Sequence, residues 1–195
     1  GVEMDNIGNF YNPADPKGQS FIPNPNRVQV KNEIDRLYTL GVRYIFPIHI
    51  TNNAFGGTAL YNSGFNVANK YNTGLTFVPE AVDASSGITF KLSSAFSAIR
   101  QDFLAGLAMG DPGYNKGHRN SIGLNRMGEY ALQYMMQKGM LIDIDHMSEK
   151  AVTKSLEIAT RFRYPLNSGH NGFRGYGAYN ENSRTDNQVR AIYNL

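Results

Sequence analysis

Metal-binding side chains follow the apolar runs of this sequence that most resemble β-strands. Glu3, His49, His146 and His170 each stand at the end of such a run, and three of the four histidines of the chain are among them. Neutral imidazole and carboxylate are ligands for zinc and related divalent ions, and a carboxylate can bridge two metals that share one water. A single histidine at a strand end is more often a hydrogen-bonded structural group. Three of them together with a glutamate favour a metal site.

Strands and helices alternate around these residues. Short apolar runs and helical spacing predict strands over 1–4, 42–50, 140–144 and 164–166, and helices over 30–38, 124–135, 148–159 and from Asp186 onward. Alternation of this kind implies parallel strands joined by right-handed crossovers, hence an α/β fold. His146 and His170 lie about one strand–helix unit apart. We therefore expect both side chains at the carboxyl edge of one sheet, where such folds place their sites.

The chain of 195 residues is long enough for one domain with a sizeable core, and we expect a single domain over 1–195. A long excursion near 51–121 interrupts the alternation with many Asn, Gly and Ser residues. Such excursions are usually functional or disordered. Helices are possible there over 65–71 and 97–109, whereas 110–121 is expected to be a polar loop with His118 exposed in it.

Composition excludes several classes of protein and site. The formal charge is +3 without a clustered basic face, so we expect no nucleic-acid partner. There is no cysteine, which excludes disulfides and thiolate metal sites. No apolar run reaches the roughly 18 residues of a transmembrane helix, so we expect no membrane-spanning segment in this chain.

Two aspartates flank Ile144 at the end of a predicted strand and alternate onto one face. One of them, Asp143 or Asp145, is placed to orient a neighbouring imidazole as a hydrogen-bond acceptor. The alternative is that the aspartates accept from backbone amides at the start of the following helix. The glycine-rich stretch over 172–177 lacks the order of a phosphate-binding motif and is expected to be a mobile loop.

Several segments together resemble one family, the membrane dipeptidases, also called renal dipeptidase-like peptidases. The segments occur in the order of the family and span nearly the whole chain: Gly-Val-Glu over 1–3, Gly-Val-Arg-Tyr-Ile-Phe-Pro-Ile-His over 41–49, Gly-Leu-Asn-Arg-Met-Gly over 123–128, Leu-Ile-Asp-Ile-Asp-His-Met-Ser over 141–148, and Ser-Gly-His over 168–170. The resemblance implies a TIM-like (β/α) barrel with a two-zinc site that hydrolyses dipeptides. This chain would supply about four parallel strands of the eight.

Carried over residue by residue, the resemblance gives each strand-end group a role. Glu3 would bridge two metals, and His146 and His170 would bind one of them. His49 would contact the substrate and stabilise the oxyanion. An arginine beyond the last histidine would receive the substrate carboxylate; Arg184 matches best because a helix start of the family type follows it, and Arg174 is the alternative.

The chain departs from the family pattern at residues that decide how many zinc ions it can bind. It contains no His-x-Asp motif for the first metal, the last aspartate of the family would lie beyond Leu195, and Asp145 replaces a small residue. With at most three ligands, we expect one zinc rather than two in this segment, and activity only in the intact protein. The rival hypothesis is a non-catalytic binding or scaffold protein derived from a barrel.

The resemblance also bears on location and assembly. The family suggests an exported, periplasmic or membrane-associated protein, although the sequence does not identify the compartment. Both ends interrupt a pattern, as in a central fragment of a longer chain. Four parallel strands cannot close a barrel and leave two open edges. We expect the isolated chain to pair with a second copy or to keep those edges exposed.

Overall fold

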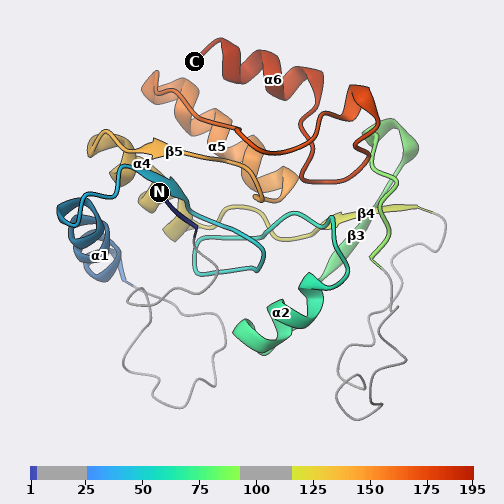
Figure 1. Ribbon diagram of the computed structural model, residues 1–195, viewed down its shortest axis with the longest axis horizontal. Coiled ribbons are helices and arrows are strands. Elements are labelled where there is room, and N and C mark those ends of the chain that lie inside the picture. Colours follow the sequence, from blue (N-terminus) through green and yellow to red (C-terminus); the bar gives the residue numbers. More distant parts are fainter. Residues whose placement is uncertain (4–25, 93–115) are drawn as a thin grey trace.

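A small parallel sheet positions the predicted site. The computed structural model describes residues 1–3, 26–92 and 116–195. Within them, β1 (Val2–Glu3), β2 (Tyr44–Phe46) and β5 (Leu141–Ile142) form a three-stranded sheet in the order β1-β2-β5, and both neighbouring pairs are parallel (Figure 1). The α/β class and the parallel pairing are confirmed.

Four predicted helices flank these strands. They are α1 (Arg27–Thr39), α4 (Arg126–Gln137), α5 (Glu149–Phe162) and α6 (Asp186–Tyr193). Each begins at a side chain that accepts from backbone N–H groups of the first turn, and these capping residues are Asn26, Asn125, Ser148 and Thr185. No helix of the described residues is long and apolar enough to cross a membrane.

The helices pack in series, α1 against α4, α4 against α5, and α5 against α6 (Figure 1). Their apolar faces enclose a core that includes the fully buried Ile45 and Ile142 of the sheet and Leu132 and Met135 of α4. Burial of side chains of this size contributes about 1.5–3 kcal/mol each to stability. This core fixes the strands so that the residues following them meet at one edge.

The strands are shorter than the sequence predicts. The apolar run over 42–50 pairs only at β2, and Pro47 ends the strand because it has no N–H to donate. The predicted strand over 164–166 is wrong: pairing is limited to a parallel bridge between Asn167 and Asp143. Pro165 removes a donor at the position where a ladder would start. The expected four strands are therefore three strands and one bridge, and the described residues form no closed barrel.

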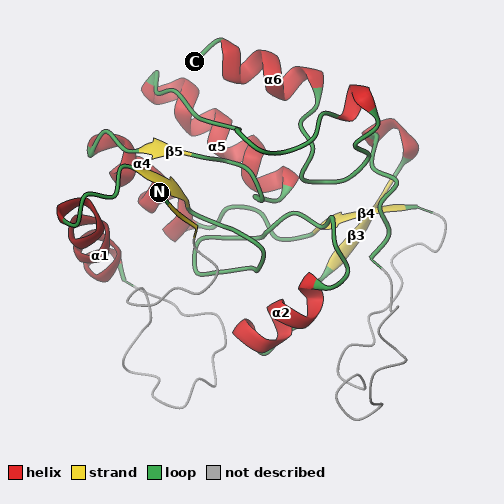
Figure 2. Cartoon of the chain, viewed as in Figure 1, coloured by secondary structure: helices red, strands yellow, loops and turns green. Residues whose placement is uncertain are grey.

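The excursion contains structure that the sequence did not predict. β3 (Pro79–Val82) and β4 (Gly117–Asn120) form an antiparallel ribbon (Figure 2). In the sequence, α2 (Phe65–Thr73) precedes β3, and a 3-10 turn over Ala84–Ser86 follows it. The prediction of a helix near 65–71 is confirmed, whereas the one over 97–109 lies outside the described residues. The predicted loop over 110–121 is wrong at β4.

His118 is the clearest correction in this region. It was expected in an exposed loop, but it lies within β4, is buried, and accepts at Nδ1 from the backbone N–H of Leu92 at 3.0 Å. The sequence Gly-His-Arg-Asn has no apolar alternation, so pairing with β3, not local pattern, makes it a strand. His118 is therefore a structural histidine.

Candidate metal centre

The four predicted strand-end residues meet at the carboxyl edge of the sheet. We call Glu3, His49, His146 and His170 the histidine cluster. His146 Nε2 lies 2.7 Å from His170 Nε2, and His49 Nε2 lies 3.3 Å from Glu3 Oε2. The rings of His49 and His146 meet edge to face with centroids 4.4 Å apart, which joins the two pairs. The structure thus brings together all four residues that the sequence placed at strand ends.

Two groups of side chains could each hold a metal ion, because their ligand atoms lie within 4.8 Å of one another. One comprises Glu3, His49 and His146, and the other comprises Asp143, Asp145 and His170. The three ligands expected from the family resemblance are therefore divided between the groups. The contact between the two Nε2 atoms connects them, since it joins His146 of one group to His170 of the other.

Both aspartates are already hydrogen bonded by neighbouring donors. Asp145 is fully buried and accepts from the Ser168 hydroxyl at 2.5 Å, the Asn171 amide at 2.5 Å and the His170 backbone N–H at 2.7 Å. A carboxylate offers about four lone-pair sites. Asp145 is thus largely satisfied as an acceptor, and the His170 imidazole also faces it, with Nδ1 3.4 Å from Oδ2.

Asp143 is bonded mainly to groups outside the cluster. It accepts from the Tyr44 hydroxyl, from the Asn167 amide at 2.5 Å and from the Asp145 backbone N–H at 2.8 Å. Burial raises the pKa of the Asp143 carboxyl above its ordinary value. Of the two predicted roles, imidazole orientation therefore fits Asp145. The amide at the start of α5 donates instead to Glu181.

His146 has an unusual backbone conformation that neighbouring segments maintain. Its φ is 66°, a left-handed value that costs a non-glycine residue on the order of 1–3 kcal/mol. The His146 N–H donates to Asn182 Oδ1 at 2.6 Å, and its carbonyl accepts from the Ala59 N–H at 2.6 Å and from the Thr58 hydroxyl at 2.8 Å. Two remote loops therefore hold this turn in place.

Tyr61 is a member of the site that sequence reasoning missed. Its hydroxyl lies 2.7 Å from His146 Nδ1, the nitrogen that faces away from His170. Its ring packs edge to face on Phe65 with centroids 5.1 Å apart. Tyr61 precedes His146 by 85 positions. No local spacing could have linked the two, because the only sequence feature was a tyrosine within the long excursion.

Arg184 lies buried beside the cluster. Its Nη2 donates to the Asn182 carbonyl at 2.6 Å, while its Nε and Nη1 have no hydrogen-bond partner among the described residues. Arg184 lines a pocket of about 340 Å³ with Ser168, Asn171, Phe173 and others. Burial lowers the pKa of Arg184 to about 10, so the guanidinium is still charged at neutral pH. A buried cation with unused donors suits an anionic group.

Arg174, the alternative to Arg184, is committed to the fold. It is buried and donates to the Ser86 carbonyl at 2.8 Å, to Glu149 Oε1 at 2.9 Å and to the Asn180 carbonyl at 3.2 Å. Its guanidinium therefore ties the loop before Arg184 to the start of α5. Of the two arginines, Arg184 is the one with unused donors.

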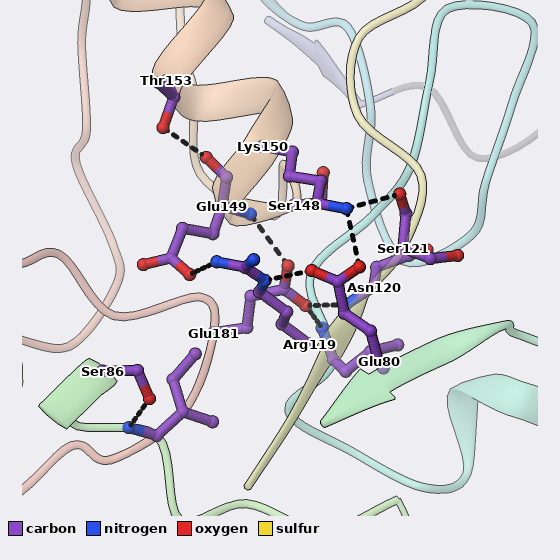
Figure 3. A network of polar contacts seen from close by, with 12 residues as sticks. Glu80, Ser86, Arg119, Asn120, Ser121, Ser148, Glu149, Lys150, Thr153 and Glu181 are labelled. Carbon is purple, nitrogen blue, oxygen red and sulfur yellow. Dashed lines mark hydrogen bonds and ion pairs between the residues drawn. The ribbon is translucent and has the colours of Figure 1, made fainter. Parts of the chain in front are cut away.

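A set of buried and half-buried ionisable side chains joins the β3–β4 ribbon to the start of α5 (Figure 3). We call it the interior network, and its members are Glu80, Arg119, Glu149, Lys150, Arg174 and Glu181. Arg119 bridges Glu80 at 2.6 Å and Glu149 at 3.1 Å, and Lys150 also binds Glu80 at 2.7 Å (Figure 3). These contacts fasten the β3–β4 ribbon to the start of α5.

Glu181 is the centre of this network. Its fully buried carboxylate accepts from the backbone N–H groups of Leu60 at 2.7 Å, Asn120 at 2.8 Å and Glu149 at 2.8 Å. Burial raises the pKa of Glu181 to about 8, and the three amide donors oppose that shift. One side chain thus joins the loop that contacts His146, the ribbon and α5.

Compared with models of known protein families, the chain matches none, and a comparison with curated proteins also finds no match. The likeness to membrane dipeptidases therefore rests on the motifs quoted above, and the assignment of function rests on the chemistry of the histidine cluster and Arg184.

Proposed function

We propose that this protein is a zinc-dependent hydrolase of the membrane dipeptidase type, built on a TIM-like barrel in its intact form, which cleaves dipeptides or similar small amides. The observation that carries the proposal is the pair of Nε2 atoms of His146 and His170, 2.7 Å apart and beside Glu3 and His49. Two imidazoles with facing Nε2 atoms and a neighbouring carboxylate are a typical donor set for zinc.

The residues proposed to hold zinc are Glu3, His146 and His170. Two nitrogens bound to one tetrahedral zinc lie about 3.3 Å apart, so the rings need only a small rotation to open from their present contact. The Glu3 side chain is 46% exposed, which leaves its carboxylate accessible. Bound zinc supplies an activated water by lowering its pKa from about 15.7 towards 7.

His49 has two possible roles at this site. The family resemblance assigns it to the substrate, where its ring N–H would stabilise the oxyanion that forms at the scissile carbonyl. Its position within 4.8 Å of ligand atoms of Glu3 and His146 also suits a ligand. His49→Ala separates these roles: a substrate contact predicts retained zinc with a large fall in kcat, whereas a ligand predicts loss of zinc.

Arg184 is proposed to bind the free carboxylate of the substrate. Its unused Nε and Nη1 donors and its place on the wall of the pocket support this role, and Arg174 has no comparable capacity. A bidentate guanidinium–carboxylate pair also orients the substrate. The proposal therefore favours dipeptides with a free C-terminus over blocked ones.

The direct test uses the full-length natural protein. Metal analysis after purification, together with hydrolysis of a dipeptide panel, should give bound zinc and turnover. His146→Ala should abolish both while the folded circular dichroism spectrum is retained. His118→Asn is the histidine control, because His118 lies in β4 and accepts from Leu92. Absence of any bound divalent ion, with His146→Ala as active as the unaltered protein, would refute the proposal. Bound zinc without turnover would favour the non-catalytic binding protein.

A further inference from the structure

We infer that Tyr61 and Asp145 are positioning residues that determine which ring nitrogen of His146 and His170 carries the proton, and so present both Nε2 atoms to a metal. The inference rests on the proposed function and deepens it. It assigns the two residues no contact with substrate.

The four side chains form a continuous chain of polar contacts. The Tyr61 hydroxyl lies 2.7 Å from His146 Nδ1, His146 Nε2 lies 2.7 Å from His170 Nε2, and His170 Nδ1 lies 3.4 Å from Asp145 Oδ2. Each imidazole thus has one nitrogen towards the other histidine and one towards an oxygen. Metal-binding histidines usually contact an oxygen acceptor through the ring nitrogen that does not bind the metal.

Asp145 determines the direction in which this series of hydrogen bonds is donated. Asp145 accepts from three neighbouring donors, and the His170 nitrogen that faces it, with Nδ1 3.4 Å from Oδ2, is placed to donate to it as well. In neutral His170 the proton is then on Nδ1, and Nε2 is an acceptor. The contact between the two Nε2 atoms therefore requires His146 to donate from Nε2. His146 Nδ1 in turn accepts from the Tyr61 hydroxyl. Without metal, every hydrogen bond in the series is therefore donated in the direction from Tyr61 to Asp145.

A metal bound to both Nε2 atoms requires a change of tautomer in His146 only. Metal ligation requires a lone pair on Nε2, and His170 already has one in this arrangement. His146 must exchange its Nε2 proton for one on Nδ1, which leaves its number of protons unchanged. The Tyr61 hydroxyl can then accept from Nδ1–H after rotating its own proton away, because a phenol both donates and accepts. Asp145 therefore fixes the tautomer of His170, whereas Tyr61 is compatible with either tautomer of His146.

The positions of both residues are determined by their surroundings. Asp145 is fully buried and held by Ser168, Asn171 and the His170 backbone. Tyr61 follows closely on Ala59, whose N–H donates to the His146 carbonyl at 2.6 Å, so the same segment contacts both the backbone and the ring of His146. The Tyr61 hydroxyl therefore stays close to Nδ1.

The test is ¹⁵N-histidine NMR of the full chain in mildly alkaline buffer, without metal and with zinc. We expect His170 as the Nδ1–H tautomer in both states and His146 to change from Nε2–H to Nδ1–H when zinc binds. Tyr61→Phe should weaken zinc binding by about tenfold, the lower end of the range for such contacts. Asp145→Asn should remove the Nδ1–H preference of His170.

Two matched variants separate positioning from general loss of structure. Tyr164→Phe removes a phenol hydroxyl that donates to the Met140 carbonyl, away from the cluster. Asp83→Asn changes an exposed carboxylate that pairs with Lys116, away from the cluster. Both should leave the tautomers and zinc affinity unchanged. If Asp145→Asn does not fold, Tyr61→Phe and the unaltered protein still decide the matter.

The outcomes also distinguish this inference from the proposed function. Zinc binding with unchanged tautomers, and with Tyr61→Phe within twofold of the unaltered protein, overturns the inference alone. Absence of zinc binding overturns the proposed function. In that event, a metal-free protein with Nδ1–H on His170 and Nε2–H on His146 still supports the assigned direction of the hydrogen bonds, and the reverse pattern overturns it.

Discussion

The interior network and the histidine cluster use charged side chains in opposite ways. In the network, Glu181 accepts three backbone amides, and Arg174 donates to three carbonyls and to Glu149. In the cluster, two imidazole nitrogens face one another, and the His170 side chain remains 47% exposed. Buried polar groups with matched partners are expensive to disrupt, whereas ligand atoms that face a common point are arranged to bind an ion.

The two regions nevertheless depend on each other. The left-handed turn at His146 is held by Asn182 and by the segment around Thr58 and Ala59. Both segments are fastened by Glu181, which lies next to Asn182 and accepts from the Leu60 N–H. The network thus stabilises the two segments that hold His146 in its strained backbone conformation. Changes in the network should cost stability, and changes in the cluster should cost metal binding.

Glu181→Ala should produce the largest loss of stability. It leaves three buried amide donors without their acceptor, and we expect a fall of about 3–5 kcal/mol in the free energy of unfolding. Urea denaturation followed by circular dichroism measures it. Glu157→Ala, an exposed change within α5, is the glutamate control and should cost well under about 1 kcal/mol. A loss at Glu181 no larger than that of the control would remove the distinction between the two regions.

The raised pKa of Glu181 predicts that the stability of the protein falls as the pH rises. Burial raises its pKa in the folded protein from the ordinary 4.5 to about 8. The folded state therefore keeps a proton that the unfolded chain has lost at pH values between these two. The contribution of this proton to stability is full below about pH 4.5 and is lost as the pH rises through about 8. Glu181→Gln should lack this decline. Parallel pH profiles for the two proteins would contradict the assignment.

Substitutions of Arg174 and Arg184 form a matched pair with smaller expected effects on stability. Arg174→Met breaks a buried ion pair with Glu149 and should destabilise the protein by about 3 kcal/mol. Arg184→Met removes a buried charge whose Nε and Nη1 lack partners in the described part of the chain, so its stability should change little or rise. With dipeptides, Arg184→Met should raise KM at least tenfold. Equal losses of stability in the two variants would show that Arg184 is structural.

The strand-end residues were predictable because parallel pairing follows from local patterns. The apolar runs before Glu3, His49 and His146 predict strands, and the caps Asn125 and Ser148 predict where the next helices begin. Parallel strands in one sheet place their carboxyl ends at one edge. That general rule was enough to place Glu3, His49 and His146 together. His170 joins them without a preceding strand, since only the bridge between Asn167 and Asp143 pairs its segment with the sheet.

The supporting residues were not predictable, since their contacts join distant segments that share no pattern. Tyr61 reaches His146 across 85 positions, and Glu181 reaches Leu60 across 121. β4 has a polar sequence that becomes a strand only because β3 lies beside it. Asp145 was recognised as an acceptor near an imidazole, but its choice over Asp143 depended on the backbone turn that places it against His170.

The smallest effect we expect concerns the turn at His146 itself. His146→Ala and His146→Gly both remove the imidazole, so both should lose zinc and turnover. They differ in backbone strain, because alanine at φ 66° is disfavoured and glycine is not. We expect the glycine variant to be more stable than the alanine variant by about 1 kcal/mol in urea denaturation. At Ser155, within α5, the same pair should show the reverse order by a similar amount, since glycine is unfavourable in a helix interior. If His146→Gly were instead the less stable of the two, the turn would not be strained, and the proposed dependence of the histidine cluster on the interior network would lose its physical basis.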